Sequence, residues 1–437
     1  MNKASKSSVQ VIYKLIPELR FPEFVDEGEW EDKQVDKLGE TLNGLSGKSG
    51  EDFGVGKPYV TYKQVFDNSI IDFLKCGKVN IGENENQNPL HKGDILFTTS
   101  SETPNEVGIA SILLESPKEA TYLNSFCFAL RPFDIKEILP EFSRYLFHTP
   151  IYRKLIVSLA QGSTRYNISK GAFKNLKLPI PETKEQIKIA ACLSSLDEVI
   201  TAQNHKLEAL KDHRKGLMQN LFPQEGEKVP KLRFLEFAEN GEWVEKNLDG
   251  ICKLVRGPFG GSLKKEIFVK DGYAVYEQSH AIYGDFNSFR YYIDDKKYSE
   301  LKRFSVKNGD LIMSCSGTMG KFALIPQNYN VGVINQALLK LTIKKGFNNI
   351  FVKMTLEAEN NQNKLLSQSA GGAIKNVVSV SQIKELELLI PSIEEQQKIA
   401  SCFSSLDHII TAQTEQIEQL KLHKKGLMQG LFPKNKT

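Results

Sequence analysis

The side chains best suited to chemistry in this chain are polar, basic and aromatic residues in short loops that follow apolar, strand-like runs. The stretch from Arg256 to Lys265 sets three glycines among three cations, and the stretch from Met313 to Lys321 is rich in hydroxyl groups. Glycine lets a backbone approach a phosphate closely, and hydroxyl and amide groups can hydrogen-bond to base edges. Because such loops recur in both halves of the chain, they predict a surface that contacts nucleic acid.

The candidate DNA-binding residues come from these loops in both halves. They are Lys48, Lys57, Tyr59, Thr98, Thr99, Ser100, Arg165, Tyr166, Asn167, Arg256, Lys264, Lys265, Tyr276, Gln278, His280, Ser314, Ser316, Thr318, Lys321 and Lys375.

Two short motifs imitate catalytic sites without completing them. Gly44–Ser49 resembles the end of a phosphate-binding loop, but Leu42 stands where that motif requires glycine. A flexible basic loop is therefore the better interpretation. Glu182-Thr-Lys184 resembles the end of a nuclease motif, but it opens a predicted helix. We interpret Glu182 as a carboxylate that interacts with the helix dipole.

Histidine and cysteine spacing gives no support for a metal site or a disulfide framework. No two of the seven histidines stand four residues apart with a neighbouring acid, and the six cysteines form no C-x-x-C pair. Reduced thiols are the expected state. We find no catalytic constellation, so we expect a protein that is not itself an enzyme and binds no cofactor or metal.

Composition sets the broad class of the protein. The chain has 437 residues, 40% apolar and 25% charged, which is typical of a soluble globular protein with two or three domains. The net charge of +4 permits nucleic-acid binding without arguing for it. No apolar run is long enough for a signal peptide or a membrane span, so we expect a cytoplasmic protein.

An internal repeat organises the chain. Leu19-Arg-Phe followed by Gly28-Glu-Trp recurs as Leu232-Arg-Phe followed by Gly241-Glu-Trp, and these hold the only two tryptophans. The segment 181–223 recurs as 391–433 with most residues identical. The segments between them, 31–180 and 244–390, have diverged much further. The shared and variable segments are therefore expected to do different jobs.

The two shared segments predict long helices that pair with each other. Apolar residues recur in steps of four and three over more than four heptads, which is typical of a coiled-coil seam. We expect an antiparallel pair, in which Gln203 and Gln413 meet near the centre. The alternative is two amphipathic helices that pack separately on globular cores. The predicted seam comprises Leu193, Leu196, Ile200, Gln203, Leu207 and Leu210 in the first helix and Phe403, Leu406, Ile410, Gln413, Ile417 and Leu420 in the second.

The variable segments predict mixed α+β domains with curved sheets. Each holds several short apolar runs typical of strands and one helix-like stretch, 140–159 in the first and 351–366 in the second. The predicted fold is α+β, with two mixed α/β domains separated by a long antiparallel two-helix coiled coil. Its parts are the first domain, 1–180, a helix in 181–223, the linker with the second domain, 224–390, and a helix and tail in 391–437.

This plan resembles the specificity subunit of a type I restriction-modification system. The resemblance rests on two divergent domains, each preceded by L-R-F…G-x-W and followed by a long helix ending in K-G-L-M-Q-x-L-F-P. It implies that each domain binds one half of a bipartite, asymmetric site on double-stranded DNA and that the helices act as a spacer. It also implies docking of two methyltransferase subunits and of restriction–translocase subunits. S-adenosylmethionine, ATP and magnesium would then belong to those partners.

Two other functions remain open at this point. One is a coiled-coil adaptor that binds proteins and no DNA. The other is a self-contained DNA-modifying enzyme, which the absence of catalytic motifs disfavours.

Overall fold

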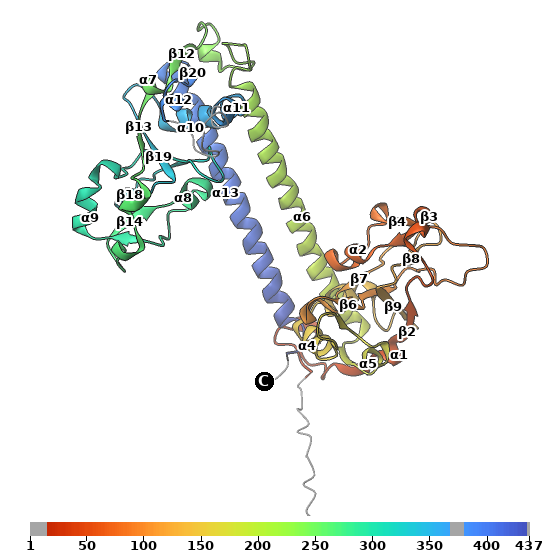
Figure 1. Cartoon of the computed structure of the whole chain (residues 1–437). Helices are drawn as coiled ribbons and strands as arrows, with labels where there is room; N and C mark the ends of the chain where they lie inside the picture. Colours follow the sequence, from red (N-terminus) through yellow and green to blue (C-terminus); the bar gives the residue numbers. More distant parts are fainter. Residues whose placement is uncertain (1–14, 368–379, 435–437) are drawn as a thin grey trace, which may run out of the picture. The chain divides into compact units, whose positions relative to one another are not determined.

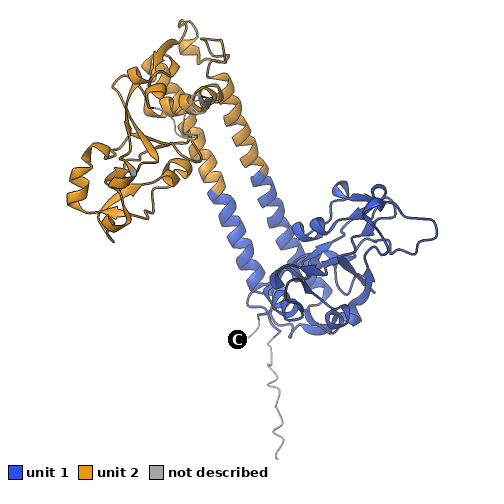
Figure 2. Cartoon of the chain, viewed as in Figure 1, with its two compact units in different colours: residues 1–204, 415–437 blue, residues 205–414 orange. Residues whose placement is uncertain are grey.

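The computed structural model describes residues 15–367 and 380–434, which form two compact units (Figure 1). Unit 1 comprises residues 1–204 with 415–437, and unit 2 comprises residues 205–414 (Figure 2). The division runs through the middle of the two long helices, α6 (Thr183–Asn220) and α13 (Ile393–Gly430). Each unit therefore contains one variable domain and part of both helices.

The two long helices form where the heptad pattern predicts them. Each begins shortly after a proline and has acidic side chains in its first turn, where they favour the helix dipole. Each ends before Pro223 or Pro433, which cannot continue a helix. Every predicted seam position is buried or half-buried.

Within each unit the helix halves run antiparallel. In unit 1, Ile189 shares a core with Phe432 while Asp197 pairs with Lys424, so the two chain directions are opposed. In unit 2, Arg214 pairs with Asp407. The basic residues Arg214 and Lys424, at equivalent places in the two helices, thus each pair with an aspartate on the facing helix. The meeting of Gln203 with Gln413 crosses the boundary between the units and stays a prediction.

Both variable domains contain a four-stranded antiparallel sheet with the same strand order. In each sheet the strand that comes first in the sequence lies at one end, and the strand that comes last in the sequence lies beside it. In unit 1 the order is β2 (Gly39–Asn43), β9 (Cys127–Pro132), β5 (Ile95–Thr98) and β7 (Ala110–Ile112); in unit 2 it is β13 (Cys252–Arg256), β19 (Leu338–Ile343), β16 (Leu311–Ser314) and β17 (Phe322–Leu324).

A three-stranded sheet completes each domain, again with matching topology. Its central strand is antiparallel to one neighbour and parallel to the other in both units. The strands are β4 (Gly77–Val79), β3 (Phe53–Val60) and β8 (Tyr122–Leu123) in unit 1, and β15 (Tyr292–Ile293), β14 (Tyr273–Tyr276) and β18 (Gly332–Ile334) in unit 2. The diverged sequences therefore keep one fold.

A two-stranded ladder closes each domain beside the long helix. It joins β1 (Glu31–Gln34) to β11 (Lys177–Ile180), and β12 (Val244–Asn247) to β20 (Glu387–Ile390). The apolar strands β11 and β20 are visible in the sequence as strand-like runs before the prolines. Their polar partners are largely exposed and carry no such signal.

The helix-like stretch of each domain is two helices, not one. The expectation of a continuous helix over 140–159 is wrong because Pro150 starts a new helix, whose first turn Thr149 caps through the Tyr152 amide. In unit 2 the break falls at Ala358, whose backbone is not helical. The helices are α3 (Pro140–Leu146), α4 (Pro150–Ser158), α10 (Asn349–Glu357) and α11 (Glu359–Ser367).

Short helices fill the connections between strands. They are α1 (Val35–Leu38), α2 (Tyr62–Asp67) and α5 (Lys170–Lys174) in unit 1, and α7 (Leu248–Ile251), α8 (Gln278–Tyr283), α9 (Asp295–Glu300) and α12 (Val380–Lys384) in unit 2.

An aromatic cluster fastens the end of a long helix into each domain core. In unit 1 the Phe432 ring lies 5.9 Å from Trp30 and 5.5 Å from Phe142, measured between centroids. In unit 2 Phe222 lies at the same 5.9 Å from Trp243 and 5.5 Å from Phe351. The repeated L-F-P and G-E-W motifs are therefore two sides of one packing contact.

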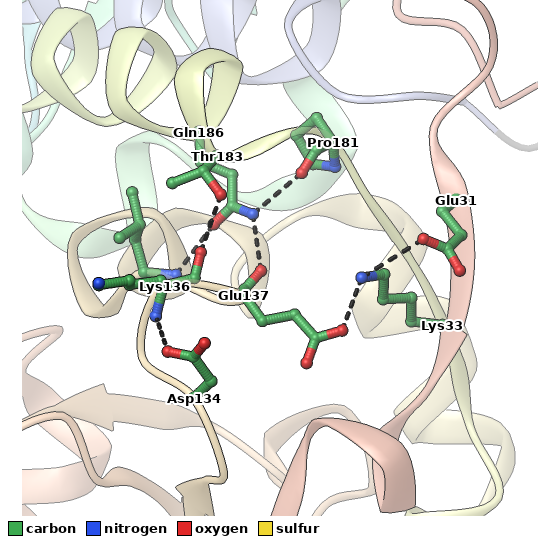
Figure 3. A network of polar contacts seen from close by, with 9 residues as sticks. Glu31, Lys33, Asp134, Lys136, Glu137, Pro181, Thr183 and Gln186 are labelled. Carbon is green, nitrogen blue, oxygen red and sulfur yellow. Dashed lines mark hydrogen bonds and ion pairs between the residues drawn. The ribbon is translucent and has the colours of Figure 1, made fainter.

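Buried polar contacts fasten the start of each long helix. The Arg20 guanidinium pairs with the buried Glu185 carboxylate at 2.7 Å, and Arg233 pairs with Glu395 at 2.7 Å. Beside it, the Gln186 amide donates to the carbonyls of Glu137 and Pro181 (Figure 3). The repeated L-R-F and E-Q motifs thus hold the helix against its domain.

Across residues 15–367 and 380–434, none of the helices has the length and apolar character needed to cross a membrane.

Candidate nucleic-acid interface

The same asparagine turn precedes the second strand of each four-stranded sheet. The Asn124 Oδ1 accepts the Phe126 amide at 2.9 Å, and the Asn335 Oδ1 accepts the Ala337 amide at 3.0 Å. Such side-chain-to-backbone bonds are typical of asparagine in turns. The two turns are therefore equivalent, and each marks the same edge of its domain, the edge at which β9 or β19 begins.

A glycine packs against each of these turns. A Cβ atom on Gly44 would lie 2.0 Å from the Asn124 carbonyl oxygen, and one on Gly257 would lie 1.8 Å from the Asn335 carbonyl oxygen. Only glycine allows so close an approach. The Gly44–Ser49 and Arg256–Lys265 loops therefore begin at the same edge as the turns.

In unit 1 the structure brings most of the predicted residues to this edge. The strand β10 (Tyr166–Asn167) pairs with β6 (Ser100–Ser101). The Thr99 amide donates to the Phe126 carbonyl at 2.8 Å. The Arg165 guanidinium lies 5.1 Å from the centre of the half-exposed Phe126 ring. Two loops far apart in the sequence thus form one surface.

Two members of this set face the interior. The Thr98 side chain is buried, and its hydroxyl accepts the Ile109 amide at 3.0 Å. The Ser100 side chain is also buried, and its carbonyl accepts the Tyr62 hydroxyl at 2.8 Å. Neither hydroxyl is presented to solvent in this structure, and the Ser100 hydroxyl has no hydrogen-bond partner among the described residues.

The remaining unit 1 candidates belong to the strand β3 and the loop before it. Lys48 pairs with Glu85 at 2.5 Å, and Lys57 pairs with Glu119 at 3.2 Å. The Tyr59 ring packs on Phe53. A hydrogen bond from Lys48, with others from the Gly82 amide and Gln87, lowers the pKa of Glu85 to about 2. Both cations therefore already have a carboxylate partner.

In unit 2 the edge contains a polar hollow of about 480 Å³. It brings two predicted residues, Gln278 and His280, next to the Asn335 turn. The hollow is lined by Glu277, Gln278, Ser279, His280, Ser288, Arg290, Asn335 and Ala337.

Gln278 holds the neighbouring hydroxyl-rich turn in place. Its Oε1 accepts the Ser316 hydroxyl at 3.0 Å, and its Nε2 donates to the carbonyls of Ser316 and Thr318. The Ser314 hydroxyl is buried, donates to the Thr318 carbonyl at 2.7 Å and accepts the Lys321 amide at 3.0 Å. These two polar side chains shape the turn over residues 314–321.

The side chains of Tyr276 and His280 are buried in this structure and bond within the domain, and a contact of either with DNA stays a prediction. Both faces of β14 are covered, since Tyr276 and Val275 belong to different core clusters. The Tyr276 hydroxyl donates to the Asn330 carbonyl at 2.6 Å, and burial raises its pKa. The His280 ring caps α8 by accepting the Glu277 amide at 2.8 Å.

The exposed candidates of unit 2 are mostly cations. Lys264, Lys265 and Lys321 are exposed and have no acidic partner among the residues that the structure describes. Arg256 ends β13, and its Nη1 atom is buried without a hydrogen-bond partner in the described part of the chain. Lys375 lies outside the described residues.

The described residues contain no group of three or more His, Cys, Asp or Glu that could hold a metal ion. Burial raises the pKa of Cys252 to about 12 and that of Cys315 to about 11, which keeps both thiols protonated. The arrangement therefore offers hydrogen-bond donors and positive charge along one edge of each domain.

Several residues of the hollow, among them Glu277, Ser288 and Arg290, are missing from the predicted set. They lie between predicted elements and match no motif. The only available signal is that Arg290 precedes two tyrosines, and its value becomes clear only in the structure.

The family model of the type I restriction modification DNA specificity domain matches the chain twice, at residues 27–212 and 240–422. The chain belongs to this family and carries its domain in both halves. The resemblance and the fold class given by the sequence are therefore confirmed.

Particular relatives share most of their length with the chain. It is 26% identical to a putative type I restriction enzyme MjaX specificity subunit of Methanocaldococcus jannaschii, over 92% of this chain and 93% of the relative. It is 22% identical to the EcoKI specificity subunit of Escherichia coli, over 78% of this chain and 73% of the relative.

Solved structures share the fold at low sequence identity. The S subunit of a type I restriction-modification system from M. genitalium matches with a TM-score of 0.54 at 16% identity, covering 96% of this chain and 99% of that one. A chain from a structure describing complex assembly and conformational transition of the type I system matches with a TM-score of 0.60 at 14% identity, covering 93% and 98%.

Proposed function

We propose that this chain is the subunit that selects the DNA sequence for a type I restriction-modification complex, and that it is not itself catalytic. The observation that carries the proposal is the double match to the DNA specificity domain across both variable segments. The curated relatives that match over nearly the whole chain are specificity subunits of type I restriction enzymes.

Each unit binds one half of a bipartite, asymmetric site. The support is that the two domains present their edges on the same framework, with equivalent turns at Asn124 and Asn335. The side chains around those turns differ, with Phe126 in unit 1 where unit 2 has Ala337. Different side chains on equivalent edges would select different bases, so the whole site would be asymmetric.

The shared helices hold two methyltransferase subunits, to which the restriction subunits are added. The support is that both copies keep apolar side chains exposed at matching places, Val199 and Ile409. Solvated apolar groups retained twice suit two copies of one partner. S-adenosylmethionine, ATP and magnesium are carried by those partners, and the complex works in the cytoplasm.

Selection from a random duplex library tests this function. The chain, purified with its methyltransferase partner, should enrich one bipartite sequence. Partner binding without sequence enrichment would favour the adaptor, and methylation of DNA by the chain alone would favour a self-contained enzyme. Either result would contradict the proposal.

The exposed lysines provide a second arm of the same experiment. Replacing Lys264 and Lys265 by alanine should weaken binding to all sequences and reduce its salt dependence, as expected for lost phosphate contacts. The matched control is Lys296→Ala with Lys302→Ala, because these lysines are also exposed in unit 2. Unchanged affinity and salt slope in the Lys264 and Lys265 variant would remove this loop from the interface.

A further inference from the structure

Two arginines, one in each unit, have guanidinium groups whose N–H donors find no hydrogen-bond acceptor among the described residues. Most arginines here have one: Arg131 pairs with Asp94, and Arg153 donates to the Asn105 carbonyl. Within residues 15–367 and 380–434, the guanidinium groups of Arg165 and Arg290 have no hydrogen-bond or ion-pair acceptor. Each lies over an aromatic ring instead.

In unit 2 a stack of rings fixes the Arg290 side chain. Its guanidinium lies 4.9 Å from the centre of the Tyr291 ring, which stacks on Phe268 with centroids 4.2 Å apart. The Tyr291 carbonyl accepts the Val275 amide at 2.9 Å, so the central strand β14 anchors the stack. The guanidinium of the exposed Arg290 therefore rests on the Tyr291 ring where it lines the hollow.

In unit 1 the same support comes from the asparagine turn itself. The Phe126 ring beneath Arg165 belongs to a residue whose amide is held by Asn124 and whose carbonyl accepts the Thr99 amide. The equivalent residue in unit 2 is Ala337, which lines the hollow together with Arg290. Two arginines from unrelated segments thus reach equivalent turns.

A guanidinium that rests on an aromatic ring and has free N–H donors can bind two hydrogen-bond acceptors that lie in one plane. Its donors form a rigid fork that can bind the O6 and N7 atoms of guanine, the commonest specific contact in the major groove. A phosphate group would also accept these bonds. The hollow disfavours a phosphate, because the acidic residue Glu277 also lines it and a carboxylate repels an anion. Asn335 adds an amide nitrogen for a neighbouring base edge.

We propose that Arg165 and Arg290 each recognise a guanine, Arg165 in the half-site bound by unit 1 and Arg290 in the half-site bound by unit 2. This inference rests on the proposed function, since it assigns individual residues to the DNA selection described above.

Lysine substitution separates guanine recognition from phosphate binding, because lysine keeps the charge and loses the fork. In the complex with the methyltransferase partner, Arg290→Lys should lose its preference for guanine at one position of one half-site. The expected loss is about 5- to 150-fold, from a discrimination of roughly 1–3 kcal/mol per bidentate contact. Arg165→Lys should do the same in the other half only. The salt slope should stay unchanged in both.

Modified bases and a matched arginine sharpen the test. Replacing the selected guanine by 7-deazaguanine should weaken binding of the unaltered complex and leave Arg290→Lys unaffected. Arg303→Lys is the control, because Arg303 is exposed in unit 2 and lies over no ring among the described residues.

Three results would overturn the proposal. In one, both lysine variants keep the full guanine preference. In another, Arg290→Ala weakens all sequences equally while Arg290→Lys binds normally, which would assign the arginine to a phosphate. In the third, the selected half-sites lack guanine. A complex that enriches no sequence would instead overturn the proposed function, and this inference with it.

Discussion

The two units share a framework and differ at the edge that it supports. Strand order, the asparagine turn, the aromatic cluster at the helix end and the buried arginine–glutamate pair recur in both. The arginine at the edge does not, because Arg165 follows α4 whereas Arg290 precedes β15. The contacts to the long helices are thus the same in both units, while the side chains at the exposed edge come from different segments.

The way each arginine is supported shows how much change the framework tolerates. In unit 1 the ring under the guanidinium comes from the turn, and in unit 2 it comes from Tyr291, which directly precedes β15 of the three-stranded sheet. The same chemistry is reached from different segments. A domain of this kind can therefore change its DNA preference without changing the contacts that hold the helices.

Lengthening the shared helices should have the largest effect. One heptad inserted into both α6 and α13 adds about 10 Å, close to three base pairs at about 3.4 Å each. The preferred spacer should grow, or recognition should be lost because the half-sites also rotate. The sequences of the half-sites should not change. Library selection measures both.

The same seven residues inserted at the exposed Gly346 turn provide the control. An unchanged spacer in a heptad variant that folds and binds its partner would show that the helices do not set the spacing.

Removing the ring at a helix end should destabilise one unit at a time. Phe432→Ala should cost unit 1 about 3–5 kcal/mol of unfolding free energy, and Phe222→Ala should cost unit 2 a similar amount. Hydrogen exchange resolves the two units. Phe133→Ala is the control, since this ring is 67% exposed. Loss of protection in unit 2 from Phe432→Ala would contradict the assignment of each ring to one core.

The interhelical aspartates should differ in importance between the units. Asp197 accepts bonds from Lys424, Arg144 and Tyr145. The described partner of the Asp407 carboxylate is Arg214, and Asp407 is more exposed. Asp197→Asn should therefore cost about 1–3 kcal/mol and Asp407→Asn less than about 1 kcal/mol. Equal losses in urea unfolding would contradict this difference.

The Lys48–Glu85 pair should give the smallest effect, confined to the unit 1 loop. The pKa of Glu85 is lowered to about 2 from 4.5, so its contribution is present above about pH 4.5 and is lost as the pH falls towards 2. Glu85→Gln imitates the protonated state at neutral pH. Hydrogen exchange should rise around residues 46–52 and stay unchanged around 256–265. Equal protection of residues 46–52 in the unaltered chain and in Glu85→Gln would show that the Lys48–Glu85 pair does not stabilise this loop.

The long helices and most strands could be predicted because their signals are local. Heptad spacing and flanking prolines define α6 and α13, and short apolar runs mark strands such as β5 and β16. The polar strands β1 and β12 have no such pattern. They form because their partners β11 and β20 supply the hydrogen bonds.

The candidate site was only partly predictable, because it depends on contacts between distant segments. Residues 99–100 and 165–167 stand out separately as polar loops, but only the β6–β10 ladder joins them. Tyr276 follows the expected strand pattern, yet both faces of that strand are covered. Arg290 has no motif, and its position depends on the ring of Tyr291.

Exchange of one variable domain tests the central claim most directly. Residues 244–390 would be replaced by the equivalent segment of a related chain, keeping both long helices and their anchors. Methylation would then be mapped across a genome in cells that contain the methyltransferase partner. One half of the methylated sequence should change while the other half and the spacer stay the same. A change in both halves, or in neither, would contradict independent recognition by the two units.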